Sequence, residues 1–321
     1  MKRGVAAMGL LATALTAGAI GFAVATAGSP EPVLAADPND PAMVLTDDRP
    51  CVAPCVKTGV VFGSATSKLN PAAGKQALSL DLFRSTKTPK QNAPTLVLAH
   101  GGGFVEGDRS QMRVVAEEFA RAGFLVASVD YRLVPKDRNN GQGIVSNKDL
   151  VPASEEAEAD LEMALRYLRR HAKELGAGVK QERYAVGGYS AGAIASLRVA
   201  IRGGDRATPK SRRFKVGAAF SIAGAECQES AKNTGCKPAY DEADAPILLF
   251  HGDADSIVQL TFARDTCTSA ILRGGGCKAY FYPEQDHFWS SGTVFGGGEG
   301  LTKRHPAIVP TAAKFLRSQL R

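Results

Sequence analysis

Short apolar runs recur along the chain from about residue 60 to the C-terminus, and polar or glycine-containing segments separate them. Runs rich in Val, Ile, Leu and Phe predict β-strands, and continuous runs are typical of parallel strands that are covered on both faces. Between them, apolar residues at intervals of three and four predict amphipathic helices. The predicted strands cover residues 60–62, 78–83, 95–99, 124–129, 184–187, 215–222, 246–250 and 278–282.

The predicted helices alternate with the later strands. This alternation predicts an α/β fold with one doubly wound, mostly parallel sheet of about eight strands, two antiparallel strands at its start and helices on both faces. In such sheets the functional residues lie just beyond the carboxyl ends of strands. Polar clusters at 100–104, 188–192, 251–255 and 286–287 all fall at that edge. The predicted helices cover residues 110–122, 154–175, 191–200, 259–272 and 306–320.

Residues 1–27 have the features of an export signal. Met1-Lys2-Arg3 precedes an apolar stretch rich in Ala, Gly and Thr, which ends in the small-residue cleavage pattern Ala25-Thr26-Ala27. We therefore expect a secreted protein. The alternative is an uncleaved segment that anchors the protein in a membrane, and contact with a membrane is expected only in that case.

The remainder of the chain divides into an arm and one domain. Residues 28–57 are rich in Pro, Ala and Asp, show no helical or strand period, and predict an N-terminal arm or linker. Residues 58–321 are expected to form the single α/β domain. Within it, the irregular segments 133–152 and 224–245 are candidates for a small cap.

Charge and cysteine content limit the classes of partner. The formal net charge of +7 is spread over short clusters, without the basic stripe and interleaved aromatic residues of a nucleic-acid-binding surface. The six cysteines are an even number, which predicts disulfide bonds in an exported protein. The alternative, a zinc site, is disfavoured because the chain has no C-x-x-C motif. We expect no nucleic-acid partner, metal or cofactor. The spacing favours the pairs Cys51–Cys55, Cys227–Cys236 and Cys267–Cys277.

The segment Gly188-Tyr189-Ser190-Ala191-Gly192 carries the clearest chemical signal. It joins a predicted strand to a helix of small residues, which is the setting of a nucleophile elbow. Glycines on both sides of Ser190 let the strand and helix approach closely around a strained serine. A chance match is the alternative in a chain with 34 glycines, so the serine needs partners elsewhere in the chain.

A serine nucleophile requires a base, and the base requires a carboxylate. Of the five histidines, His287 alone follows the last strand in a loop after Ser190, so elimination selects it as the base. Asp255 follows the strand 246–250 and is the preferred acid, with Asp253 as the alternative. The order Ser190, Asp255, His287 is the order expected for this architecture.

The glycine run after strand 95–99 predicts the site that stabilises negative charge on the reacting oxygen. Backbone N–H groups of Gly102 and Gly103, with that of Ala191 at the start of the following helix, are the expected donors of an oxyanion hole. A phosphate-binding loop is the alternative. It is disfavoured because no Gly-Lys-Ser/Thr follows.

Five motifs in this order resemble those of the α/β-hydrolase superfamily. Within it, the chain resembles the carboxylesterases with an HGGG oxyanion loop, a group that includes hormone-sensitive-lipase-like and related small esterases. The acid segment looks more like the pattern of small esterases and dipeptidyl-peptidase-like hydrolases. The motifs are His-Gly-Gly-Gly-Phe (100–104), Asp-Tyr-Arg-Leu (130–133), Gly-Tyr-Ser-Ala-Gly (188–192), His-Gly-Asp-Ala-Asp-Ser-Ile-Val (251–258) and Asp-His (286–287).

The resemblance covers about residues 58–320 and implies an activity. It implies that Ser190, Asp255 and His287 form a catalytic triad beside the oxyanion hole. We expect a secreted serine carboxylesterase that hydrolyses small-molecule esters with short or medium acyl chains, because the cap segments are too short for a large apolar lid. An acyltransferase, a lipase, a peptidase of the same fold and a non-catalytic binding module are the alternatives.

Overall fold

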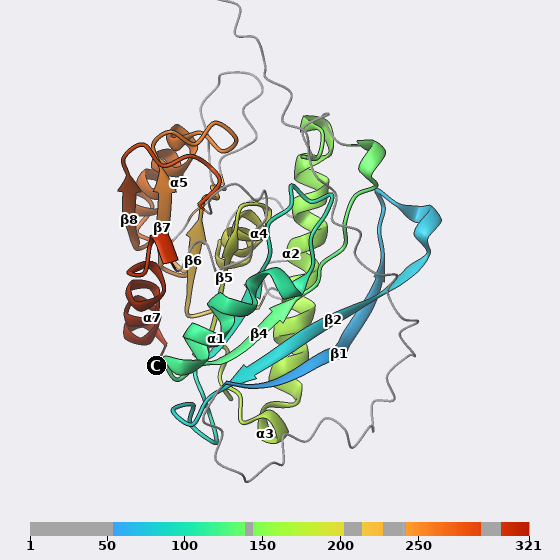
Figure 1. Ribbon diagram of the computed structural model, residues 1–321, viewed down its shortest axis with the longest axis vertical. Helices are drawn as coiled ribbons and strands as arrows, with labels where there is room; N and C mark the ends of the chain where they lie inside the picture. The colour runs from blue at the N-terminus through green and yellow to red at the C-terminus, as the bar shows by residue number, and fades with distance from the viewer. Residues whose placement is uncertain are drawn as a thin grey trace, which may run out of the picture. The chain divides into compact units, whose positions relative to one another are not determined.

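The computed structural model describes residues 54–138, 144–201, 214–226, 240, 242–289 and 303–320. These residues build an eight-stranded sheet in the order β1-β2-β4-β3-β5-β6-β7-β8, with helices on both faces (Figure 1). The predicted α/β fold is confirmed. The strands are β1 (Cys55–Thr66), β2 (Lys75–Arg84), β3 (Thr95–Ala99), β4 (Leu125–Val129), β5 (Tyr184–Tyr189), β6 (Ala218–Ile222), β7 (Ile247–Gly252) and β8 (Cys277–Tyr282).

The sheet is parallel from β4 to β8 and antiparallel at its start. β2 pairs antiparallel with both β1 and β4, and every pairing from β4 through β3, β5, β6 and β7 to β8 is parallel. Parallel strands place their carboxyl ends at the same edge of a sheet. The loops that follow β3, β5, β7 and β8 therefore open at one edge.

Helices bury both faces of the sheet. Alternate residues of a strand point to opposite faces, so Val97 and Ala99 of β3 join one apolar core while Leu96 and Leu98 join the other. The first core includes side chains of α2, α4 and α5, and the second includes those of α1 and α7. The helices are α1 (Arg113–Arg121), α2 (Asn147–Arg170), α3 (Ala172–Leu175), α4 (Ala191–Ala200), α5 (Leu260–Leu272) and α7 (Ile308–Gln319), with 3-10 turns η2 (Pro71–Ala73), η3 (Arg109–Met112), η4 (Lys136–Arg138) and η5 (Gln181–Arg183).

Two elements extend further than the sequence predicts. α2 begins at Asn147 rather than Ser154, and it contains Pro152, which lacks the N–H for one intrahelical hydrogen bond. Ser146 precedes the helix, and its hydroxyl is 2.9 Å from Oδ2 of Asp149 in the first turn. The strand β1 begins at Cys55, inside the segment expected to be an arm. The proline in α2, and the Lys57-Thr58-Gly59 stretch in β1, interrupt the apolar periodicity from which the elements were predicted.

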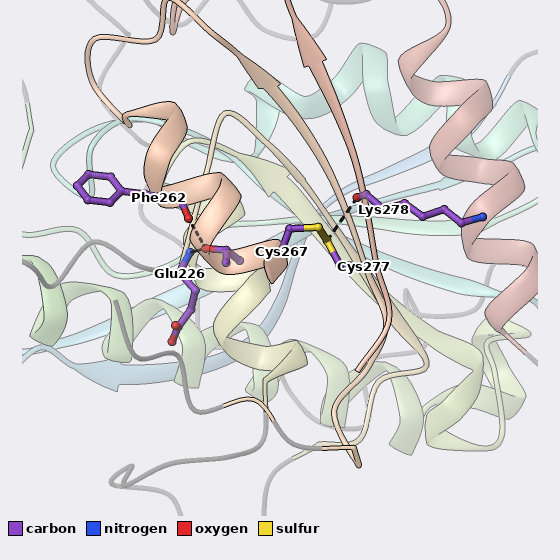
Figure 2. The surroundings of a disulfide bond; sticks show 6 residues. Glu226, Phe262, Cys267, Cys277 and Lys278 are labelled. Atoms are coloured by element: carbon purple, nitrogen blue, oxygen red, sulfur yellow. Dashed lines mark hydrogen bonds between the residues drawn. A yellow bond between two sulfur atoms is a disulfide. The ribbon is translucent and has the colours of Figure 1, made fainter. Parts of the chain in front are cut away.

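The disulfide Cys267–Cys277 forms as predicted and joins α5 to β8 (Figure 2). The Cα atoms of the two cysteines are 5.4 Å apart. The pairs Cys51–Cys55 and Cys227–Cys236 stay predictions, because Cys51, Cys227 and Cys236 lie outside the described residues.

Several other expectations also fall outside the described residues. These include the export signal 1–27, most of the arm 28–57, and residues 139–143 and 227–239 of the two cap segments. Within the described part of the chain, no helix combines the length and apolar composition that crossing a bilayer would require.

Candidate active site

Ser190 lies in a sharp turn between β5 and α4. Its backbone has φ 51° and ψ −120°, a combination that L-residues rarely adopt. A Cβ atom on Gly188 would lie 2.5 Å from the carbonyl oxygen of Ala99, and one on Gly192 would overlap the same oxygen. Only glycine fits at either position. The Ser190 N–H donates to the Ile222 carbonyl at 2.9 Å, which fixes the turn against β6.

The structure brings together the three residues that the sequence predicts as a triad. Ser190 Oγ is 2.8 Å from His287 Nε2, and His287 Nδ1 is 2.8 Å from Asp255 Oδ2. Each residue is at most 6% exposed. A carboxylate accepts the Nδ1–H proton, so the imidazole presents the lone pair of Nε2 to the serine hydroxyl. Such a chain can withdraw the hydroxyl proton as the oxygen attacks a carbonyl carbon.

Asp255 rather than Asp253 is the carboxylate that contacts the histidine. The N–H groups of Ile257 and Val258 donate to Asp255 Oδ1 at 2.9 and 2.7 Å, which leaves Oδ2 for His287. Asp253 Oδ1 instead accepts the N–H of Glu284 at 2.7 Å. This second aspartate therefore ties the loop after β7 to the loop that carries His287.

The glycine loop after β3 passes beside Ser190. A Cβ atom on Gly101 would stand 3.4 Å from the Ser190 Cβ, and Gly102 and Gly103 have φ values of 115° and 58°. Among the described residues, none accepts a hydrogen bond from the N–H of Gly102, Gly103 or Ala191. These three groups, the predicted oxyanion donors, are thus available to a ligand, and Ala191 opens helix α4.

Side chains of the Asp-Tyr-Arg segment support the glycine loop. The Tyr131 hydroxyl donates to the His100 carbonyl at 2.9 Å, and the two rings stack with centroids 4.2 Å apart. Asp130 accepts hydrogen bonds from the backbone and side chain of Arg109 at the end of the loop. Burial lowers the pKa of His100, so its imidazole is neutral near pH 7. Sequence reasoning identified this segment only as a motif and missed its role.

The comparisons with known proteins agree with this architecture. The BD-FAE family model matches residues 80–225. The chain is 34% identical over 118 residues to the esterase LipI of Mycobacterium tuberculosis, a match that covers 36% of this chain and 32% of that protein. The chain therefore spans about a third of the length of this curated relative.

Solved structures share the fold over most of the chain. Esterase 2 of Thermogutta terrifontis phosphorylated by paraoxon superimposes with a TM-score of 0.60 and 21% identity, covering 83% of this chain and 94% of that one. The butyrate-bound form of that esterase gives a TM-score of 0.59 at 20% identity, with the same shares covered. This chain has the α/β-hydrolase fold. The curated relative and the solved structures reported above are esterases, in agreement with the resemblance to carboxylesterases.

A second histidine contacts Asp255, the predicted acid residue. His251 Nε2 is 2.6 Å from the Val258 carbonyl and 3.3 Å from Asp255 Oδ2. Burial lowers the pKa of His251, so it remains a neutral donor that holds the loop around Asp255. Among the residues that the structure describes, no three His, Cys, Asp or Glu side chains group in a way that could hold a metal ion.

Proposed function

We propose that this protein is a serine carboxylesterase with Ser190 as nucleophile, His287 as general base and acid, and Asp255 as the carboxylate that orients the histidine. The observation that supports this most directly is the chain of two 2.8 Å hydrogen bonds through His287, beside the available N–H groups of the glycine loop. These are the parts that acyl transfer through a covalent intermediate requires.

The reaction follows from this geometry. Ser190 Oγ attacks the ester carbonyl carbon while His287 Nε2 takes the hydroxyl proton, and the N–H groups of Gly102, Gly103 and Ala191 bind the oxyanion. Collapse of the tetrahedral intermediate releases the alcohol, which takes the proton from His287, and leaves an acyl-enzyme. Water then loses a proton to His287 and attacks the acyl carbon, which releases the carboxylic acid and restores Ser190.

We propose small esters with short or medium acyl chains as substrates. Thermogutta terrifontis esterase 2, which shares the fold, has been solved with propionate bound and with butyrate bound. A panel of nitrophenyl esters from acetyl to long-chain tests the proposal, with free acid and transferred ester compared in the presence of an alcohol. Turnover confined to long chains would overturn it, and transfer of the acyl group to the alcohol in preference to water would identify an acyltransferase.

We also propose that the protein is exported and that residues 1–27 are removed. The support is the composition of this segment and its small-residue end. Mass spectrometry of the N-terminus of protein recovered outside the cell tests the proposal. A mature chain that retains Met1 and stays with the membrane fraction would instead indicate an anchor.

The role of Ser190 is tested by Ser190→Ala. We expect kcat for a short-chain nitrophenyl ester to fall by roughly 10³-fold or more, because the nucleophile is lost while the fold stays intact. Paraoxon treatment of the unaltered protein should phosphorylate a peptide that contains Ser190. Full turnover in the variant, with an unchanged unfolding midpoint, would refute the proposal.

The role of Asp255 is tested against its neighbour. Asp255→Asn should lower kcat by roughly 10²- to 10⁴-fold, because the amide no longer fixes the imidazole tautomer. Asp253→Asn is the matched control: the Asn carbonyl can still accept the Glu284 N–H, so kcat should stay within about threefold. Equal losses in the two variants would contradict the assignment.

A further inference from the structure

Tyr189 lies between Gly188 and the candidate nucleophile, and its hydroxyl reaches the loop that carries the candidate base. The hydroxyl donates to the carbonyl of His287 at 2.5 Å. We propose that Tyr189 is a positioning residue that holds the His287 loop in register with Ser190. This inference rests on the proposed serine esterase function.

The Tyr189 hydroxyl is suited to holding the His287 loop in place at all times. It donates its one proton to the backbone of this loop, at the carbonyl of His287. Burial raises the pKa of Tyr189, so the hydroxyl keeps its proton and its donor role across the neutral range. Trp289 itself is almost fully buried, so the loop ends in a packed side chain.

The ring of Tyr189 also contacts the glycine loop. A Cβ atom on Gly101 would stand 2.7 Å from Tyr189 Cδ1, so the ring fits only because residue 101 is glycine. The ring centroid also lies 5.7 Å from that of His287. The side chain therefore lies near the loop of the expected oxyanion donors and the loop of the base, and it belongs to the same turn as Ser190.

Other contacts hold different parts of the His287 loop. Asp253 binds the N–H of Glu284, and the amide of Gln285 is 3.4 Å from the Phe288 carbonyl. Asp255 holds the imidazole ring through Nδ1 but makes no contact with the His287 backbone. Tyr189 supplies a hydrogen bond to the backbone of His287 itself. Its loss should displace the imidazole by a fraction of an ångström, and such displacements lower rates strongly.

Tyr189→Phe removes the hydroxyl and keeps the ring. We expect kcat to fall by about 10- to 100-fold while KM changes less than about threefold, because ground-state binding does not depend on the base. Tyr184→Phe is the matched control. Tyr184 opens the same strand, and its hydroxyl donates to Gly178 at 2.7 Å, away from the site. Its kcat should stay within about twofold of the unaltered protein.

A double-mutant cycle separates positioning from general support of the fold. If Tyr189 acts through His287, Tyr189→Phe should cost nothing further in a His287→Ala background. Tyr131→Phe provides the contrast: its hydroxyl binds the glycine loop, so its loss should persist in that background. An equal effect of Tyr189→Phe in both backgrounds, or unchanged kcat in the single variant, would overturn the inference.

Hydrogen exchange gives a second measurement on the folded protein. The amides of residues 287–289 should exchange faster in Tyr189→Phe, because this loop loses its hydrogen bond to the Tyr189 hydroxyl, while the amides of β5 keep their rates. Unchanged exchange in residues 287–289 would overturn the inference even if kcat falls. A fully active Ser190→Ala variant would refute the proposed function, whereas a fully active Tyr189→Phe variant refutes the positioning role of Tyr189 alone.

Discussion

Ser190 is one of five non-glycine residues with positive φ among those that the structure describes. Three of the others, Phe104, Ala223 and Glu284, lie in loops at the same edge of the sheet. Residues in this conformation cost free energy and persist only where their surroundings fix them. The strain is therefore concentrated where the hydroxyl, the glycine loop and the histidine loop meet.

Gly102 has a backbone conformation and a lack of space that only glycine can accommodate. Its φ is 115°, and a Cβ atom would overlap the carbonyl oxygen of Glu106. Gly102→Ala should move the loop and lower kcat by roughly 10²- to 10³-fold, the range for loss of an oxyanion donor. Steady-state kinetics on a short-chain ester provide the measurement.

Gly74 is the matched control for that substitution. It also has positive φ, at 64°, but has open space around its Cα and ends a turn between β1 and β2. Gly74→Ala should lower the free energy of unfolding by about 1 kcal/mol and leave kcat unchanged. If both variants lose stability and neither loses activity, the glycine loop does not contribute to catalysis.

Single residues differ in how far the sequence reveals them. Ser190 stands in a local motif, and His287 emerges by elimination among five histidines, so both could be predicted. The contacts of Tyr189, Tyr131 and Asp253 could not be, because each depends on a side chain that reaches a backbone group distant in the chain. No periodicity or spacing encodes such a reach.

Among the elements, β8 is an edge strand that a neighbouring strand stabilises on one side. Among the described strands it is the last in the sheet and pairs only with β7, and the disulfide ties its first residue to α5. The Cys277 sulfur lies near the Lys278 carbonyl, and Thr266, which precedes Cys267, donates to the Phe262 carbonyl within α5 (Figure 2). The loop of His287 follows directly after β8.

Replacement of both cysteines by serine tests the contribution of this disulfide. The bond closes a segment of 10 residues, and cross-links of this span stabilise by about 2–3 kcal/mol. Urea unfolding of Cys267→Ser/Cys277→Ser should show that loss. kcat at 25 °C should not change, because neither cysteine contacts the site. A variant as stable as the unaltered protein would contradict the prediction.

Elements were predictable where their pattern is continuous. The helix α4 has the predicted bounds, 191–200, because its small apolar residues follow the elbow without interruption. The start of α2 was missed because the segment from Asn147 to Pro152 begins with three polar residues and contains a proline. Tertiary contacts override those local preferences, and a single sequence carries no sign of them.

At the scale of the whole molecule, two buried histidines couple stability to pH. Burial lowers the pKa of His100 and His251 from the ordinary value of 6.5. His100 faces Asp130 and Asp108, and His251 faces Asp255 and His287. Because the unfolded chain binds these protons more readily, stability from both histidines is complete above pH 6.5. It declines as the pH falls from there toward the folded-state pKa values.

The variant His251→Gln tests this coupling. Between pH 7 and 5 the free energy of unfolding should fall more steeply in the unaltered protein than in the variant, because glutamine does not titrate. Taking the difference between the two slopes removes the contribution of the other titratable groups to the pH dependence. These groups include the buried carboxyls of Asp160 and Glu162, whose pKa values burial raises. Identical slopes in urea titrations across this range would contradict the prediction.

The predicted topology agrees with the structure because the order of strands and helices restricts a doubly wound sheet to few arrangements. The carboxyl edge at which the polar clusters gather follows from that topology. Details such as the reversal of β2 against both neighbours are set by pairing between strands. The four site loops, after β3, β5, β7 and β8, are thus predictable as a group, while their mutual contacts are not.

The separation of the site residues along the chain has a consequence for folding. Hydrogen bonds of the site join residues 32, 97 and 98 positions apart, and the last of these residues follows the final strand. Contacts of such range form late, since the entropy of closing long loops opposes them until the intervening structure is in place. With Ser190 as the nucleophile, a molecule reacts with a serine-directed label only after β8 has docked. Such a label therefore counts correctly folded molecules rather than polypeptide chains.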